Sequence, residues 1–125
     1  MPLIPEDVAS KSVFVLEDTL LIAEGIAMQL RGLGFQDIST ALSLQEAWAD
    51  IDHETPDIAL LDLNLGKGEN SLTIARALLD RKVAVIVITG YAGVHEGTDE
   101  VRQSTVLTKP FNSDELATAI LASLS

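Results

Sequence analysis

The sequence predicts a doubly wound α/β domain, in which helices cover both faces of a five-stranded parallel sheet. Short apolar runs alternate with amphipathic segments along the chain, which is the order that builds such a sheet. The run at 83–88 is entirely apolar and mostly β-branched, so it indicates a strand buried on both faces. The composition is 47% hydrophobic but only 4% aromatic, which favours an aliphatic α/β core over a β-sandwich. At 125 residues the chain is long enough for one such domain.

The first half of the chain begins with an expected N-terminal extension, residues 1–11, ahead of a domain at 12–125. Pro2, Pro5 and the lack of a clear period predict little structure in the extension. Ser43 and Glu46 have the spacing of a capping box, so they mark the start of a helix. The elements predicted here are a strand at 13–16, a helix at 19–33 with Ile22, Ile26, Leu30 and Leu33 at helical spacing, a strand at 35–40 and a helix at 43–51 that buries Ala47 and Trp48.

The second half holds the central strand, an apolar run from Ile58 that ends at Asp62. Pro56 and Gly66 bound this run, as expected for a short buried strand. Segment 91–105 has few apolar residues, so we expect a loop or a frayed turn in place of a well-packed fourth helix. The other predicted elements are a helix at 71–80, strands at 83–88 and 106–108, and a helix at 112–124.

The charge of the chain excludes several classes of partner. There are 8 basic and 19 acidic residues, a formal net charge of −11, which repels nucleic acid and anionic lipid and favours cations. There is no cysteine for disulfide or thiolate chemistry. No apolar run approaches the roughly 20 residues of a membrane span, and the N-terminus lacks a signal-peptide layout. We therefore expect a cytoplasmic protein that binds neither nucleic acid nor membrane.

Polar residues stand where the predicted strands end. Glu17 and Asp18 follow the first strand, Asp62 the third, Thr89 the fourth and Lys109 the fifth. Parallel strands end at one edge of a sheet, so these side chains are expected to meet there. Carboxylate oxygens favour Mg²⁺ or a similar hard cation. Together with a hydroxyl and an ammonium they suit a phosphoryl group, which a carboxylate can accept as nucleophile.

With these residues in place, the chain resembles the receiver domains of bacterial two-component response regulators. The resemblance covers residues 12–124 and rests on the acidic pair Glu17-Asp18, on Asp62, on Thr89 and on the Lys109-Pro110-Phe111 segment. It implies the flavodoxin-like strand order 2-1-3-4-5. It also implies a switch or phosphate sink that a sensor histidine kinase phosphorylates, with at most slow autodephosphorylation as enzymatic activity.

The resemblance assigns a metal role to four residues. Asp18 and Asp62 would bind Mg²⁺ directly, together with the backbone carbonyl of Asn64, and Glu17 would help through a water molecule. Asp62 would also accept the phosphoryl group.

Two further residues would hold the phosphoryl group itself. Thr89 would bind one of its oxygens and Lys109 would pair with another. The family usually has a cis peptide bond before the proline that follows its lysine, which is compatible with Lys109-Pro110.

Several positions depart from the usual family pattern. Gly66 stands where proline is common, and Val106 where an aromatic switch residue is usual. The segment from Val87 to Tyr91 partly matches a subclass with a Phe-Ala-Thr-Gly-x-Tyr type motif, which is associated with HWE-type sensor kinases. Our hypothesis is that Tyr91 takes over part of the switch role together with Thr89.

Two other functions remain as alternatives. A small Mg²⁺-dependent phosphatase of the haloacid-dehalogenase type also uses an Asp nucleophile, but that nucleophile follows the first strand, and no cap domain is evident. A flavodoxin-like or pseudo-receiver binding module would work without phosphorylation, although Glu17-Asp18 would repel a flavin phosphate. No output domain is expected after Leu124, so the signal would pass to an unknown downstream protein.

Overall fold

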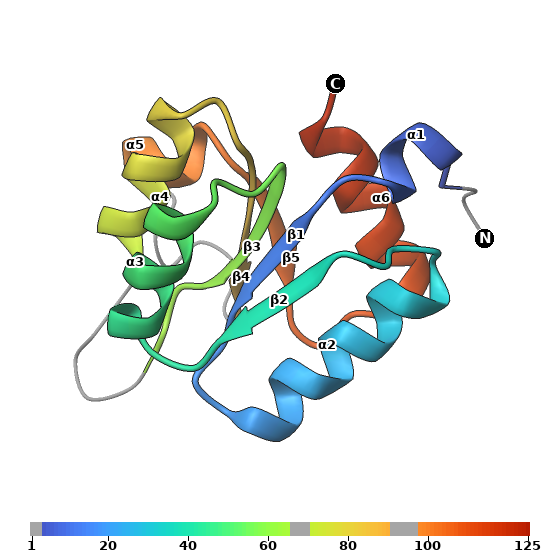
Figure 1. The fold of residues 1–125 in the computed structure, drawn as a ribbon, viewed down its shortest axis with the longest axis horizontal. Helices are drawn as coiled ribbons and strands as arrows, with labels where there is room; N and C mark the ends of the chain where they lie inside the picture. Colours follow the sequence, from blue (N-terminus) through green and yellow to red (C-terminus); the bar gives the residue numbers. More distant parts are fainter. Residues whose placement is uncertain (1–3, 66–70, 91–97) are drawn as a thin grey trace.

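A computed structural model describes residues 4–65, 71–90 and 98–125, and these form a five-stranded parallel sheet between two layers of helices (Figure 1). The order is β2-β1-β3-β4-β5, which confirms the predicted fold and strand order. The strands are β1 (Val13–Leu16), β2 (Ile38–Ala41), β3 (Ile58–Asp62), β4 (Ala84–Thr89) and β5 (Thr105–Thr108). All four neighbouring pairs are parallel.

The helices divide between the two faces of this sheet. They are α1 (Glu6–Ala9), α2 (Leu20–Gly32), α3 (Leu44–His53), α4 (Leu72–Asp80), α5 (Asp99–Arg102) and α6 (Ser113–Ser123). Helices α1, α2 and α6 lie on one side and α3, α4 and α5 on the other (Figure 1). No helix in the described part of the chain is long and apolar enough to cross a membrane.

Alternating strand residues supply the two cores, because successive side chains of a strand point to opposite faces. Phe14 and Leu16 pack beneath α3 and α4, whereas Val13 and Val15 pack beneath α2 and α6. The strand β3 is buried along its whole length. This arrangement fixes the end of β3, and hence Asp62, in the middle of the sheet.

Local signals set where two helices begin. The Ser43 hydroxyl accepts a hydrogen bond from the Glu46 N–H at 3.1 Å, and the Glu46 carboxylate accepts one from the Leu42 N–H at 3.2 Å. Asn112 and Glu115 form a complete capping box at the start of α6. Both helices begin where the sequence predicts, but the box at Ser43 is not complete, because Glu46 accepts the Leu42 N–H and not the Ser43 N–H.

Three expectations about the first half are wrong in detail. The N-terminal extension is not without structure, because it contains α1, and Ile4 and Val8 pack against the core. Phe35 is buried but lies before β2, which begins only at Ile38, because its N–H bonds back to the Leu30 carbonyl of α2 at 3.1 Å. Ile22 is 42% exposed, so the buried face of α2 follows Ala23 and Ile26 instead.

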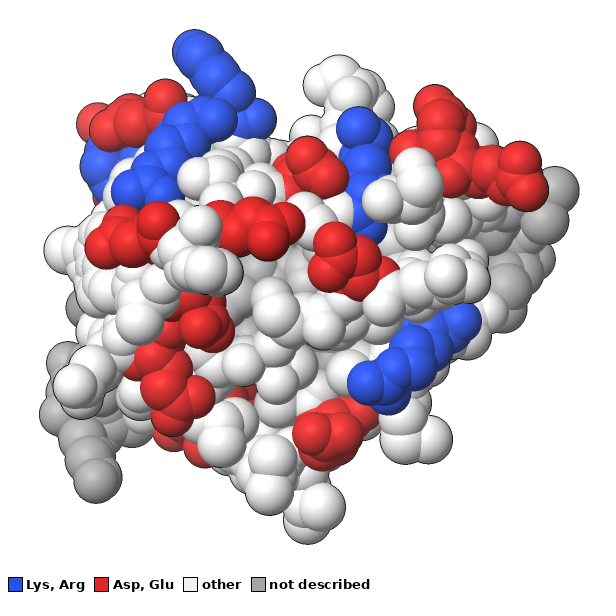
Figure 2. Space-filling model, viewed as in Figure 1, with Lys and Arg blue, Asp and Glu red and all other residues white. Residues whose placement is uncertain are grey.

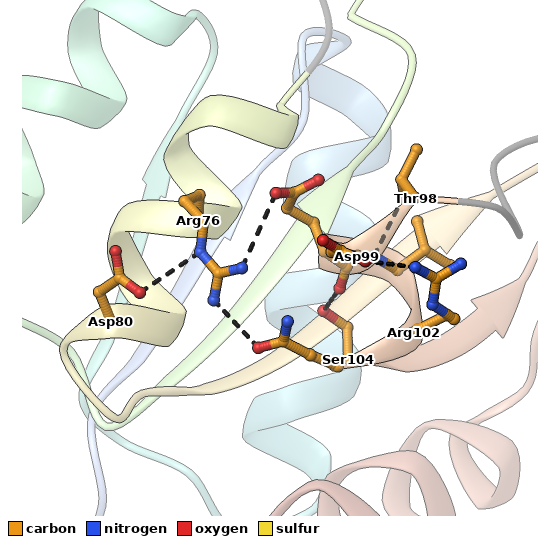
Figure 3. Close-up of polar contacts among 9 residues, drawn as sticks. Arg76, Asp80, Thr98, Asp99, Arg102 and Ser104 are labelled. Atoms are coloured by element: carbon orange, nitrogen blue, oxygen red, sulfur yellow. Dashed lines mark hydrogen bonds and ion pairs between the residues drawn. The ribbon is translucent and has the colours of Figure 1, made fainter.

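The connection after β4 agrees with the expected weak helix. Within the described residues it contains only α5, four residues long, while residues 91–97 lie outside the description. Arg76 of α4 reaches across to this segment (Figure 3), with its guanidinium 3.0 Å from the Gln103 amide oxygen and 3.9 Å from the Glu100 carboxylate. Val101 is buried against the core. One apolar anchor and a polar contact therefore hold α5 in place.

Candidate functional site

The carboxyl ends of the strands bring the predicted polar residues together at one edge of the sheet. Asp62 is the last residue of β3 and Thr89 the last of β4, while Glu17 and Lys109 directly follow β1 and β5. The Lys109 N–H donates a hydrogen bond to the Thr89 carbonyl at 2.8 Å, which continues the pairing of β4 with β5. The sheet register therefore carries Lys109 to the same edge as the acids.

The Lys109 ammonium lies between two of the carboxylates. Its Nζ is 2.9 Å from Glu17 Oε1 and 2.9 Å from Asp62 Oδ2. Glu17 is 1% exposed and Asp62 5% exposed, so both carboxylates are removed from bulk water. Among the described residues, the Lys109 ammonium is the cation that pairs with both of them. Lys109 is 92 positions from Glu17 and 47 positions from Asp62 in the sequence. Lys109 precedes Pro110 through a cis peptide bond, as expected from the resemblance.

Burial changes the acidity of this site. Desolvation of Glu17 is the largest effect, and it raises the pKa of the carboxyl to about 7 from an ordinary 4.5, against the opposing hydrogen bond from Lys109. Burial by itself would lower the pKa of the Lys109 ammonium, but hydrogen bonds to Glu17 and Asp62 outweigh it and raise that pKa. The lysine therefore carries its charge, and Glu17 can exchange a proton near neutral pH.

The oxygens of the acidic cluster suit a hard divalent cation. Glu17, Asp18 and Asp62 each place a carboxylate oxygen within 4.8 Å of the others, and Asp18 is exposed to solvent. An all-oxygen donor set with an open side is typical of Mg²⁺, which keeps several waters when bound by one or two carboxylates. The residues present therefore fit this metal.

Backbone N–H groups fix how two of the carboxylates point. The Thr19 N–H donates to Glu17 Oε2 at 3.1 Å, and the Asn64 N–H donates to Asp62 Oδ1 at 3.0 Å. Each buried acid therefore has one oxygen bound to the backbone and the other to Lys109. Asn64 itself is exposed, two residues beyond Asp62.

The structure adds one residue that sequence patterns did not single out for the site. Ser71, fully buried before α4, donates a hydrogen bond from its hydroxyl to the Asp62 carbonyl at 2.8 Å. In the sequence, Ser71 looks like an ordinary start of a helix, so only the fold reveals this contact.

The structure describes most of the other positions named in the sequence analysis, but not Tyr91. Thr89 is half-buried at the end of β4, and Val106 is 45% exposed on β5. Trp48 packs against the core as predicted. Tyr91 lies outside the described residues.

Acidic side chains dominate the surface around this framework. Figure 2 shows them spread over the visible face, with basic side chains in fewer places. This distribution matches the net charge of −11.

Comparison with known proteins gives matches over nearly the whole chain. The family model for the response regulator receiver domain matches residues 13–121. The solution structure of SdrG from Sphingomonas melonis Fr1 is similar, with 33% identity, a TM-score of 0.78, and coverage of 94% of this chain and 98% of that one.

Two further solved structures are similar. The receiver domain of the PhyR response regulator from Erythrobacter litoralis is 28% identical, with a TM-score of 0.77 and coverage of 92% and 90%. PhyR from Bartonella quintana, described as an anti-anti-sigma factor, is 25% identical, with a TM-score of 0.75 and coverage of 94% of this chain and 50% of that one. No curated protein matches the chain.

Proposed function

The chain belongs to the response regulator receiver domain family, and from this premise we propose that it is a phospho-accepting switch or phosphate sink of a two-component system. Asp62 is the proposed acceptor. The observation that carries the proposal is the position of the Asp62 carboxylate, buried at the end of the central strand, with the Lys109 ammonium 2.9 Å away and two further acids beside it.

Four residues would hold the metal that this chemistry uses. Asp18 and Asp62 would bind Mg²⁺ directly, the Asn64 backbone would add its carbonyl, and Glu17 would act through water. Bound Mg²⁺ neutralises charge on the phosphoryl oxygens during transfer. The cluster of carboxylate oxygens within 4.8 Å supports this assignment.

Three side chains would serve the phosphoryl group. Asp62 Oδ1 accepts the Asn64 N–H and Oδ2 faces Lys109, so the carboxylate is oriented before any phosphoryl donor arrives. Lys109, whose pKa is raised, would pair with a phosphoryl oxygen, and Thr89 at the end of β4 would donate a hydrogen bond to another. Autodephosphorylation would be the only enzymatic activity.

The proposed partners are proteins. A sensor histidine kinase, of the HWE type by the partial motif around Thr89, would supply the phosphoryl group in the cytoplasm. The net charge of −11 and the anti-anti-sigma description of one similar structure support a protein, and not nucleic acid, as the downstream target.

The test is intact-protein mass spectrometry after incubation with acetyl phosphate and Mg²⁺. We expect one phosphoryl adduct in the wild type, which requires Mg²⁺ and is lost in Asp62→Asn. Asp50→Asn, an exposed carboxylate on α3, is the matched control and should keep the adduct.

Other results would point to other functions. Sustained turnover of a phosphomonoester over many cycles would support a phosphatase. A wild type with neither an adduct nor Mg²⁺ binding would contradict the proposal and leave a pseudo-receiver that acts by contact alone.

A further inference from the structure

Ser71 contacts the backbone of the proposed acceptor from nine positions away in the sequence. Its side chain is 0% exposed, and its hydroxyl donates a 2.8 Å hydrogen bond to the Asp62 carbonyl. A serine directly before a helix normally uses its oxygen to accept a bond from the N–H groups of the first turn. Ser71 makes no such capping bond with the described residues of α4. Its hydroxyl therefore serves the end of β3.

The sheet explains why the Asp62 carbonyl needs a donor. Alternate residues of β3 bond to opposite neighbours: Ile58 bonds to the β1 side through Ser12, whereas Leu63 bonds to Ile88 on the β4 side. Asp62 is four residues, an even number, beyond Ile58, so its backbone carbonyl points toward the same neighbour, β1. The pairing of β1 with β3 ends at Leu16 and Leu61, one residue too early to reach it. A buried carbonyl without a donor is costly, and the Ser71 hydroxyl satisfies it.

We propose that Ser71 is a positioning residue for the phosphoacceptor site. Its hydroxyl holds the backbone at Asp62 in the orientation seen here, in which the carboxylate reaches both the Asn64 N–H, at 3.0 Å, and Lys109 Nζ, at 2.9 Å. The same bond joins the end of β3 to the start of α4, and so it also restrains the position of the Asn64 carbonyl. The effect of Ser71 on phosphorylation rests on the proposed function, whereas its positioning of the Asp62 backbone does not.

The Ser71 hydroxyl bonds to the backbone of Asp62 and not to the carboxylate that would accept the phosphoryl group, and this sets the expected effect of removing the hydroxyl. Its loss should leave the charges of the site unchanged and loosen their geometry. Residues that orient metal ligands typically affect metal affinity or activity by about 10- to 100-fold. We expect Ser71→Ala to weaken Mg²⁺ binding and slow phosphorylation by about tenfold, the lower end of that range.

The first measurement uses the metal-free protein, so it does not depend on phosphorylation. Amide hydrogen exchange by NMR should show the Asn64 N–H exchanging about tenfold faster in Ser71→Ala, because its acceptor Asp62 Oδ1 is no longer held. The Phe35 N–H, bonded to the Leu30 carbonyl at 3.1 Å, serves as a distant reference and should keep its rate. Ser123→Ala, which removes a hydroxyl-to-carbonyl bond of 2.7 Å within α6, is the matched control variant.

The second measurement compares Mg²⁺ affinity by calorimetry in the wild type, Ser71→Ala and Ser71→Thr, which restores a hydroxyl. Loss in Ser71→Ala with recovery in Ser71→Thr, and no change in Ser123→Ala, would support the proposal. Unchanged Asn64 exchange and unchanged Mg²⁺ affinity in a folded Ser71→Ala would overturn it, even with phosphorylation of the wild type intact. Faster Asn64 exchange in a protein that takes no phosphoryl group would support the geometric role and count against the proposed function only.

Discussion

Glu17 should make the metal-free protein less stable as the pH rises from about 5 to 8. Burial raises the pKa of the Glu17 carboxyl in the folded protein to about 7, whereas the ordinary value of 4.5 applies to the unfolded chain. Between these values the folded protein keeps a proton that the unfolded chain has lost. Stability falls with pH wherever the folded state binds more protons. The stability that the protonated Glu17 contributes is therefore lost between about pH 4.5 and pH 7, and the loss is complete above that range.

The size of this effect follows from the same shift. One pKa unit corresponds to about 1.4 kcal/mol, so a shift from 4.5 to about 7 amounts to at most about 3.5 kcal/mol over the full pH range. The hydrogen bond from Lys109 already opposes the shift, and this value is what remains after it. Glu17→Gln keeps a similar side chain but has no titrating group. The free energy of unfolding of Glu17→Gln, relative to that of the wild type, should therefore increase by up to about 3 kcal/mol from pH 5 to pH 8.

Urea unfolding in EDTA at pH 5, 6, 7 and 8, followed by circular dichroism, measures the difference. Glu24→Gln removes the same formal charge from an exposed position on α2 and controls for general charge repulsion. Saturating Mg²⁺ should abolish the fall in the wild type, because metal binding favours ionised carboxylates. Parallel pH curves for the wild type and Glu17→Gln would refute the reasoning.

Two further changes test other parts of the structure. Lys109→Met leaves two buried carboxylates without their shared cation. In the absence of metal it should lower the free energy of unfolding at pH 8 by about 1–2 kcal/mol, a small value because the lysine is 30% exposed. Equal urea midpoints for the variant and the wild type would contradict this prediction. Phe35→Ala removes a ring that is 1% exposed and should cost about 3–5 kcal/mol in the same assay. The half-buried Phe111 provides the comparison for this second change, and if Phe111→Ala cost as much as Phe35→Ala, burial would not be the cause.

Local patterns in the sequence predicted most of the fold. The apolar run that ends at Asp62 is β3, and the caps at Ser43 and Asn112 start α3 and α6. These predictions succeed because strand periodicity and capping depend on residues only a few positions apart. The strand order came from the family resemblance, and the structure has it. The short helix α1 escaped prediction because four residues carry too little periodicity.

The sequence by itself determined which polar residues end the strands, and parallel pairing then brings such ends to one edge of the sheet. Only the tertiary structure decided how these residues meet. The Lys109 ammonium lies between Glu17, 92 positions away in the sequence, and Asp62, 47 positions away. The sheet order places β1 beside β3, and parallel pairing brings the end of β5 to the same edge of the sheet. Burial of Glu17, and hence its raised pKa, arises from the packing around it. The contact of Ser71 with the Asp62 carbonyl likewise exists only because β1 ends one residue before β3 does. Such effects depend on distances in space, which no local spacing of residues encodes.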